Sequence, residues 1–196
     1  MIDRTKVRVI HGGHKGTEAE FGRAAAKWGV EETTLSYEGH NMERAENVEI
    51  LSDDELDKGQ VSMEFVFQRM GRRFVRSKGI SRVIHSLFHV VVRSDELFAI
   101  GWIQENKTVK GGTGWGVELA KLFNRTVHVF DQQSEAWFTW SGGAWKPSEP
   151  RLVERTVAVT GTRSLTDAGR IAIEDVFERS LGAAPEIGEP ASTSVH

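Results

Sequence analysis

The sequence predicts an α/β fold in which helices cover both faces of a doubly wound, mainly parallel sheet. Short β-branched segments alternate with longer segments whose apolar residues recur at helical spacing. Glycine-rich loops at 11–17, 111–116 and 161–164 follow predicted strands, as the turns at the carboxyl edge of a parallel sheet do. No long linker divides the 196 residues, so we expect a single domain over residues 1–182.

The first half of the chain is predicted to begin with a strand and a helix joined by a glycine loop. The predicted elements are, in order, a strand at 6–10, a helix from Thr17 to Trp28, strands at 33–37 and 48–51, and a helix within 54–73. We expect Thr17 to cap the first helix and Gly29 to end it. The apolar segment 83–92 fits either the end of a helix or a strand.

The second half continues the alternation and adds an aromatic hairpin. It is predicted to contain a strand at 97–100, a helix from the loop 111–116 to about Phe123, a strand at 126–130, a hairpin at 136–145, a strand at 155–160 and a helix at 167–181. Two glycines, Gly142 and Gly143, between aromatic segments are typical of a tight β-hairpin. The small, polar residues 183–196 are expected to form a disordered tail.

Composition excludes several classes of protein and site. The chain has no cysteine, so disulfides, thiolate zinc sites and cysteine nucleophiles are impossible. Its apolar runs are too short for a membrane span and its N-terminus lacks the apolar core of a secretion signal, so we expect a cytoplasmic protein. No metal site is predicted, because the histidines lack ligand spacing; His85 and His89, four residues apart, are interpreted as a packed or basic pair.

Charge is unevenly distributed along the chain. Segment 31–57 is rich in acidic residues, with Arg44 as its one basic residue, whereas 65–94 contains no acidic residue. The basic residues of the second segment are Arg69, Arg72, Arg73, Arg76, Lys78, Arg82 and Arg93. They form either a solvated face opposite an acidic loop or a positive field for an anionic ligand. The net charge of −3 argues against general nucleic-acid binding.

The three glycine loops are the candidate ligand site. Glycine lets successive backbone N–H groups point at an anion, and the start of a helix adds partial positive charge. The predicted ligand-binding residues are Gly12, Gly13, Lys15, Gly16, Thr17, Gly111, Gly112, Thr113, Gly114, Trp115, Gly161 and Arg163. Each loop could instead be a tight turn, and Trp115 either stacks on a base or fills the pocket wall.

The motifs of these loops resemble those of a known superfamily. Segment 11–18 (HGGHKGTE) has the form hGGxxGxD/E, and 111–118 (GGTGWGVE) is similar to the GGxGTxxE motif of LOG phosphoribohydrolases. Segment 157–163 (VAVTGTR) is similar to the strand-GSR start of YspA-like and DprA-like proteins. Together they resemble the SLOG superfamily. Trp115 departs from the motif's threonine, and Lys110 stands where LOG enzymes have a proline.

The order of the motifs is rearranged relative to that superfamily. The GSR-like unit comes first in YspA-like proteins but last here, so the chain resembles a circular permutant, as in the cpYpsA-like group of molybdenum-cofactor carriers. Permutation predicts that Val157–Thr160 pairs beside Val7–Ile10 in one sheet. Alternatively, the C-terminal unit is exchanged between two protomers. We expect a homodimer.

The resemblance implies a Rossmann-like domain that binds a nucleotide-derived or other phosphorylated small molecule, for sensing, sequestering or carrying it. A bound nucleotide or a molybdopterin-like ligand is the expected cofactor. A first alternative is a LOG-like phosphoribohydrolase that cleaves the N-glycosidic bond of a nucleoside monophosphate. The resemblance then makes Glu118 and an upstream arginine catalytic; Arg76, Arg82 and Arg93 are candidates, and we take Arg82. A second alternative is DprA-like binding of single-stranded nucleic acid.

Overall fold

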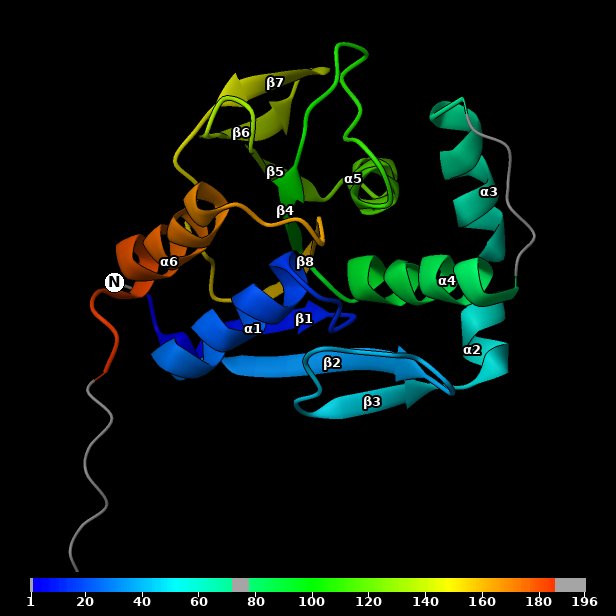
Figure 1. Cartoon of the computed structure of the whole chain (residues 1–196), viewed down its shortest axis with the longest axis horizontal. Helices are drawn as coiled ribbons and strands as arrows, with labels where there is room; N and C mark the ends of the chain where they lie inside the picture. Colours follow the sequence, from blue (N-terminus) through cyan, green and yellow to red (C-terminus); the bar gives the residue numbers. More distant parts are fainter. Residues whose placement is uncertain (1, 72–77, 186–196) are drawn as a thin grey trace, which may run out of the picture.

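The computed structural model describes residues 2–71 and 78–185, in which an eight-stranded sheet is flanked by helices on both faces (Figure 1). The strands are β1 (Arg8–His11), β2 (Glu31–Tyr37), β3 (Val48–Leu51), β4 (Glu96–Gly101), β5 (Thr126–Asp131), β6 (Ala136–Ser141), β7 (Ala144–Pro147) and β8 (Thr156–Gly161). The helices are η1 (Arg4–Lys6, a 3-10 turn), α1 (Thr17–Trp28), α2 (Asp53–Asp57), α3 (Gln60–Arg69), α4 (Lys78–Val92), α5 (Thr113–Leu122) and α6 (Asp167–Leu181).

The sheet has the strand order β3-β2-β1-β8-β4-β5-β6-β7. The first six strands of this order run parallel, and β6 and β7 add an antiparallel hairpin at one edge. The predicted doubly wound, mainly parallel α/β fold with a small aromatic hairpin is therefore confirmed.

The last strand in the sequence lies in the middle of the sheet. In β8, Val157 is paired with Val9 of β1 on one side and with Glu96 of β4 on the other. This is the pairing that permutation predicts, and it occurs within one chain. The carboxyl ends of β1, β8 and β4 consequently lie next to each other, because parallel strands end at the same edge.

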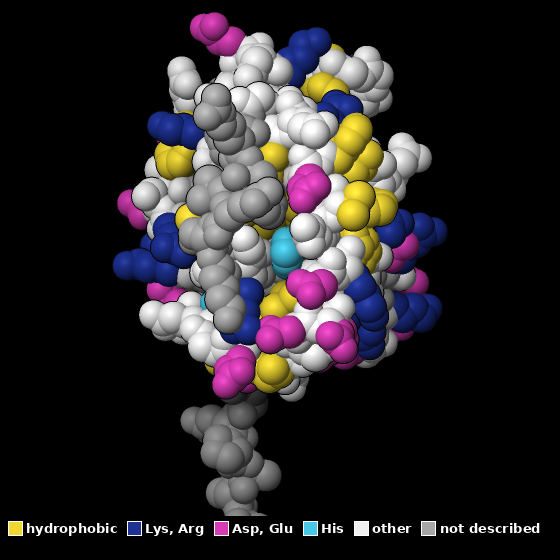
Figure 2. Space-filling view, turned by 90° about the vertical axis from the view of Figure 1, so that its right-hand side faces the viewer, with side chains coloured by type: hydrophobic (Ala, Val, Ile, Leu, Met, Phe, Trp, Pro, Cys, Tyr) yellow, Lys and Arg dark blue, Asp and Glu magenta, His cyan; other side chains and the backbone are white. Residues whose placement is uncertain are grey.

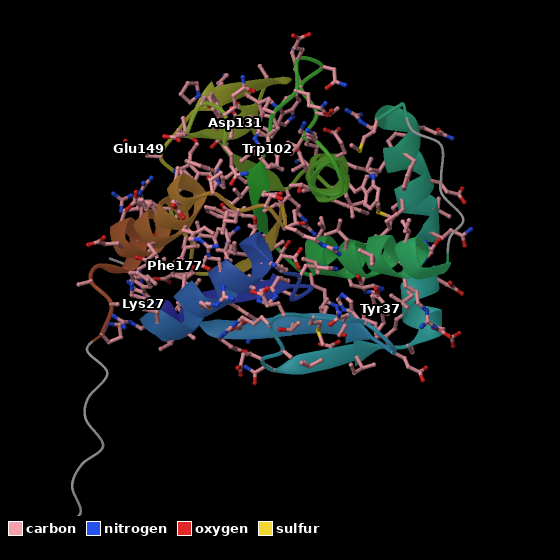
Figure 3. All side chains as sticks on the ribbon, in the orientation of Figure 1. Lys27, Tyr37, Trp102, Asp131, Glu149 and Phe177 are labelled. Atoms are coloured by element: carbon pink, nitrogen blue, oxygen red, sulfur yellow. The ribbon has the colours of Figure 1, made fainter. Side chains whose placement is uncertain are left out.

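The core consists of two apolar layers, one on each face of the sheet. Alternation along β4 separates them: Phe98 and Ile100 join the layer under α1 and α6, whereas Leu97 and Ala99 face α4 and α5. Phe177 of α6 packs on Trp28 of α1 with ring centroids 5.5 Å apart (Figure 3). Both faces are covered, which is why the central strands are nearly continuously hydrophobic.

The structure corrects two predictions about the chain before β4 and decides a third. The helix expected within 54–73 is two helices, α2 and α3, separated at Gly59, where an added Cβ would lie 2.9 Å from Cβ of Phe88 in α4. Segment 83–92, which fitted a helix or a strand, belongs to helix α4. Thr17 is the first helical residue of α1 and Gly16 is its N-cap, so the predicted threonine cap is wrong.

On the side of the molecule that carries α3, hydrophobic side chains gather beside acidic and basic ones (Figure 2). In α3 itself, Val61 is 79% exposed and Phe65 is 44% exposed.

Among the described residues, no helix combines the length and apolar character needed to cross a bilayer. One sheet contains all the strands from Arg8 to Gly161. Most of the expected tail, 186–196, lies outside the described residues.

Candidate functional site

A cavity of about 410 Å³ lies at the carboxyl edge of the sheet, where β1, β4 and β8 end. All three predicted glycine loops contribute to it. The lining residues are Gly12, His14, Glu18, Val83, Ser86, Leu87, Val90, Trp102, Lys110, Gly111, Gly112, Thr113, Trp115, Thr160, Gly161, Thr162 and Arg163. The volume is within the range of pockets that hold small molecules.

One wall of the cavity is apolar and aromatic. Val83, Leu87 and Val90 reach it from α4, and Trp102 follows directly after β4 (Figure 3). The ring of Trp115 packs on Phe67 of α3, with centroids 5.3 Å apart, so its position is set by the core. Such a wall suits a flat or apolar ligand body.

Two cations lie at this cavity without an acidic partner. Arg163 and Lys110 are both exposed, and neither forms an ion pair with a carboxylate of the described residues. Nζ of Lys110 is 5.8 Å from the ring centroid of Trp102. Because exposed cations beside a pocket attract and orient anions, the site has the charge to bind a negatively charged group.

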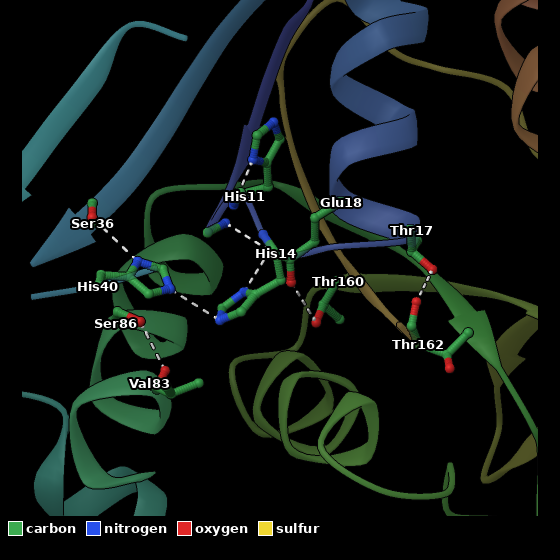
Figure 4. Close-up of polar contacts among 12 residues, drawn as sticks. His11, His14, Thr17, Glu18, Ser36, His40, Val83, Ser86, Thr160 and Thr162 are labelled. Atoms are coloured by element: carbon green, nitrogen blue, oxygen red, sulfur yellow. Dashed lines mark hydrogen bonds and ion pairs between the residues drawn. The ribbon is translucent and has the colours of Figure 1, made fainter. Parts of the chain in front are cut away.

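The carboxylate of Glu18 holds the first glycine loop in place (Figure 4). Its Oε2 accepts hydrogen bonds from N–H of Gly12 at 3.1 Å and N–H of His14 at 3.0 Å, and lies 2.9 Å from Nδ1 of His14. Thr160 donates to the other oxygen, Oε1, at 3.4 Å. Burial alone would raise the pKa of Glu18, but the charge and N–H groups of His14 and the charge of His11 lower it to about 2.

The middle glycine of this loop is also engaged within the protein. N–H of Gly13 donates to Nδ1 of His11 at 3.0 Å, and Nε2 of His11 lies 2.8 Å from Glu32. Arg44 donates two hydrogen bonds of 2.6 Å to the same Glu32. The amides of Gly12, Gly13 and His14 therefore already have partners, so an anion in the cavity would use other donors.

The first and third loops are locked together. The amide and hydroxyl of Thr17 both donate to the carbonyl of Thr162, at 3.1 and 3.0 Å. A Cβ at Gly161 would lie 2.4 Å from Oγ1 of Thr17, and one at Gly16 would lie 2.5 Å from the carbonyl of Thr162. Gly13, Lys15, Gly16 and Thr17 do not line the cavity. The contacts of Gly16 and Thr17 with Thr162 instead fix the backbone next to Arg163.

The second loop divides between cavity and core. Gly111, Gly112, Thr113 and Trp115 line the cavity, but Gly114 does not. A Cβ at Gly114 would lie 2.1 Å from the carbonyl oxygen of Val109, so close packing explains this glycine.

Both residues predicted as catalytic form ion pairs outside the cavity lining. Oε1 of Glu118 lies 2.8 Å from Nζ of Lys121, and Oε2 lies 3.5 Å from Nε of Arg69. Arg82 donates to the carbonyl of Glu38 at 3.0 Å and pairs with Asp53 at 2.6 Å. Neither side chain lines the cavity.

Two described arginines of the basic segment, Arg82 and Arg93, pair with the acidic segment 31–57, whereas Arg69 pairs with Glu118. Arg82 pairs with Asp53, and Arg93 pairs with Glu49 and Glu55. For Arg82 and Arg93, these ion pairs agree with the first of the two predicted alternatives, a basic face opposite an acidic segment. Arg72, Arg73, Arg76 and the side chain of Lys78 lie outside the part of the chain that the structure describes.

A pair of histidines borders the cavity. His14 comes from the first loop and His40 from the turn after β2, and their ring centroids are 4.7 Å apart. Burial alone would lower the pKa of His14, but the charge and hydrogen bond of Glu18 raise it. Burial and the charge of His14 lower the pKa of His40 to about 4. The ring of His40 also stacks on Tyr37, with centroids 4.5 Å apart.

Sequence reasoning missed several residues of this site. They are His14, Glu18, Val83, Ser86, Leu87, Val90, Trp102, Lys110, Thr160 and Thr162. The four-residue spacing of His14 and Glu18 across the start of a helix was a usable signal, since it brings two side chains together. Lys110 directly precedes the second glycine loop, at the position where LOG enzymes have a proline, so the motif gives no signal for it.

Comparison with known proteins adds one fold relative. The sequence matches no family model, and no curated protein matches it. Among solved structures, the fold is similar to the crystal structure of a protein from Syntrophus aciditrophicus SB described as a "Putative molybdenum carrier protein". The likeness covers 87% of this chain and 92% of that chain, with a TM-score of 0.52 and 13% sequence identity. The two proteins therefore share a Rossmann-like fold.

Proposed function

We propose that this protein binds an anionic small molecule, nucleotide-derived or otherwise phosphorylated, in the cavity and sequesters or carries it. The observation that carries the proposal is the pair of cations, Arg163 and Lys110, that form no ion pair with a carboxylate of the described residues and lie beside an apolar and aromatic cavity of about 410 Å³. The description of the fold relative as a molybdenum carrier supports a carrier of this kind, for which a molybdopterin-like ligand and molybdate are candidates.

The charges of the site determine how such a ligand would lie. Glu18 is ionised and buried, so it repels an anionic group, whereas Arg163 and Lys110 attract one. The phosphate or other oxyanion is therefore assigned to these two cations. A hydroxyl or N–H group of the ligand is assigned to Oε1 of Glu18, whose contact with Thr160 is long at 3.4 Å. The flat part of the ligand lies against Trp115.

We also propose that the chain is a circularly permuted member of the SLOG superfamily. The central position of β8 beside β1 supports this, together with the assembly of the three motif loops around one cavity. A homodimer and a cytoplasmic location remain predictions.

Thermal unfolding in the presence of ligand tests the proposal. The probes are inorganic phosphate, AMP, ADP-ribose and molybdate, each titrated to millimolar concentration. A ligand that binds only the folded state raises the melting temperature by mass action; at one hundred times Kd the gain is about 2.7 kcal/mol. We expect at least one probe to stabilise the protein, and Arg163→Ala and Lys110→Ala each to reduce the shift.

Arg151→Ala is the matched control, because Arg151 is exposed and precedes β8 at the opposite edge of the sheet. It should leave the shift unchanged. An unaltered melting temperature with every probe, or equal shifts in the Arg163 and Arg151 variants, would refute the proposal.

A further inference from the structure

The imidazoles of His14 and His40 direct the same ring atom at each other. Nε2 of His14 lies 3.1 Å from Nε2 of His40 (Figure 4). The two residues come from different parts of the chain, the loop after β1 and the turn after β2. The fold, and not a local sequence repeat, therefore brings the two nitrogens together.

Each ring is oriented by a partner on its other nitrogen. Nδ1 of His14 lies 2.9 Å from the carboxylate of Glu18, and Nδ1 of His40 lies 3.2 Å from Oγ of Ser36. A carboxylate or hydroxyl on Nδ1 is the usual arrangement behind a metal-ligating histidine, because it fixes the ring and leaves the lone pair on Nε2. The stacked ring of Tyr37 further restricts His40.

We propose that Nε2 of His14 and Nε2 of His40 together bind one divalent transition-metal ion of the zinc, cobalt and nickel class. Metal–nitrogen distances of about 2.0–2.1 Å in a tetrahedral site place two ligating nitrogens about 3.3 Å apart. The observed separation of 3.1 Å is close to this value. Imidazole is a suitable ligand for these ions.

Two protein ligands leave coordination positions open. No group of three or more His, Asp or Glu side chains converges on one point among the described residues, so other positions fall to water or to a molecule in the cavity. His14 itself lines that cavity, which gives such a molecule access to the ion. The negative charge of Glu18 behind His14 offsets part of the repulsion between the ion and Arg163.

The same four side chains can instead form a chain of hydrogen bonds without an ion. His14 and His40 would then share a proton between their Nε2 atoms, and Glu18 and Ser36 would satisfy the outer nitrogens. A metal ion needs the lone pairs of both Nε2 atoms, so it displaces that proton. In a neutral pair the proton moves to Nδ1 of His40, where Oγ of Ser36 accepts it, and in a protonated pair it leaves to the buffer.

The decisive experiment is a titration of the full chain, carrying no polyhistidine tag, with Co²⁺ followed by visible absorption, and with Zn²⁺ followed by calorimetry. We expect one equivalent of ion to bind. His14→Gln and His40→Gln should each weaken binding at least tenfold, and the double variant should abolish it. His85→Gln is the matched control and should bind as the wild type does.

A milder variant separates the loss of metal binding from the loss of folded structure. Ser36→Ala removes only the hydroxyl beside His40 and should weaken binding by about tenfold while the circular dichroism spectrum stays unchanged. No stoichiometric binding by the wild type, or binding that survives in the folded double variant, would overturn the proposal. Arg163→Ala and Lys110→Ala leave both histidines intact, so failure of the anion site and failure of the metal site are separate results.

Discussion

Oε2 of Glu18 lies 2.9 Å from Nδ1 of His14 and accepts hydrogen bonds from the backbone of Gly12 and of His14 itself. One buried carboxylate thus determines the path of the first glycine loop and the orientation of a ring that lines the cavity. The loop is organised around an internal anion. At Gly12 an added Cβ would lie 3.2 Å from Oε2 of Glu18, so this glycine allows the close approach of the carboxylate.

This pair predicts a stability maximum in mildly acidic solution. The pKa of Glu18 is lowered from 4.5 to about 2, so its stabilisation, about 3 kcal/mol, is complete above pH 4.5 and is lost as the pH falls toward 2. The pKa of His14 is raised from 6.5, so its contribution is complete below pH 6.5 and is lost as the pH rises through the folded-state value. Both contributions are present between about pH 4.5 and 6.5.

Urea denaturation of wild type and Glu18→Gln from pH 2 to 8 measures this contribution. The difference in unfolding free energy should be about 3 kcal/mol near pH 5.5 and should shrink toward zero at pH 2. Glu64→Gln, on the exposed side of α3, serves as the control and should show no such difference. A Glu18 difference that does not depend on pH would mean that the carboxylate acts only through packing.

The fold could be predicted from the sequence because its signals are local and repeated. Strands such as Val157–Thr160 are apolar and β-branched, and they precede glycines at the ends where parallel strands turn. The close approach of Gly59, between α2 and α3, to Phe88 of α4 could not be predicted, because the two residues are distant in the sequence. The missed cap has a similar cause: Thr17 bonds to Thr162, which is 145 residues away.

The site was predicted at the level of loops more than of side chains. Glycine patterns located the three loops around the cavity, but they could not separate glycines that face it from glycines packed against backbone. Glu118 shows the limit for charged residues. Its position in the sequence resembles that of the catalytic carboxylate in the LOG motif, yet Lys121, one helical turn later, forms an ion pair with it. Glu18, which sequence reasoning passed over, is the carboxylate that lines the cavity.

The second glycine loop offers a matched pair of substitutions. Gly114→Ala should lower the unfolding free energy by about 1–3 kcal/mol or more, because the new Cβ would lie 2.1 Å from the rigid carbonyl of Val109. Gly112→Ala, two residues earlier, meets nothing closer than the Trp115 ring at 3.7 Å and has a φ of −66°. It should change stability by less than about 0.5 kcal/mol.

Thermal and denaturant unfolding of the two variants provide the measurement. Gly112 lines the cavity, so Gly112→Ala is also expected to weaken ligand binding while the protein stays folded. Equal stability of the two variants would show that the loop moves away from Val109 at little cost. It would then contradict the assignment of Gly114 to packing.

The ion pair of Lys121 and Glu118 is expected to be structural. Nζ of Lys121 lies 3.7 Å from the ring centroid of Trp140 and 4.6 Å from that of Trp145, so this side chain joins α5 to the hairpin. The side chains of Lys121 and Glu118 are 6% and 4% exposed. Burial lowers the pKa of Lys121, although the hydrogen bond and charge of Glu118 oppose this. Removing one partner leaves the other charge buried, which costs about 3–5 kcal/mol.

A double-mutant cycle tests this role. Lys121→Met should destabilise strongly, because it leaves the buried Glu118 with only the longer, exposed contact to Arg69 at 3.5 Å among the ion pairs of the described residues. Adding Glu118→Gln should recover part of the loss, because the buried charge is then removed. Lys27→Met is the control, since Lys27 also pairs with a glutamate, Glu174, at 2.9 Å and lies 4.7 Å from the Trp28 ring. The pair is exposed, so this variant should cost less than about 1 kcal/mol. Equal losses in the Lys121 and Lys27 variants, or no recovery in the double variant, would remove the structural assignment and return Glu118 to the list of candidate catalytic groups.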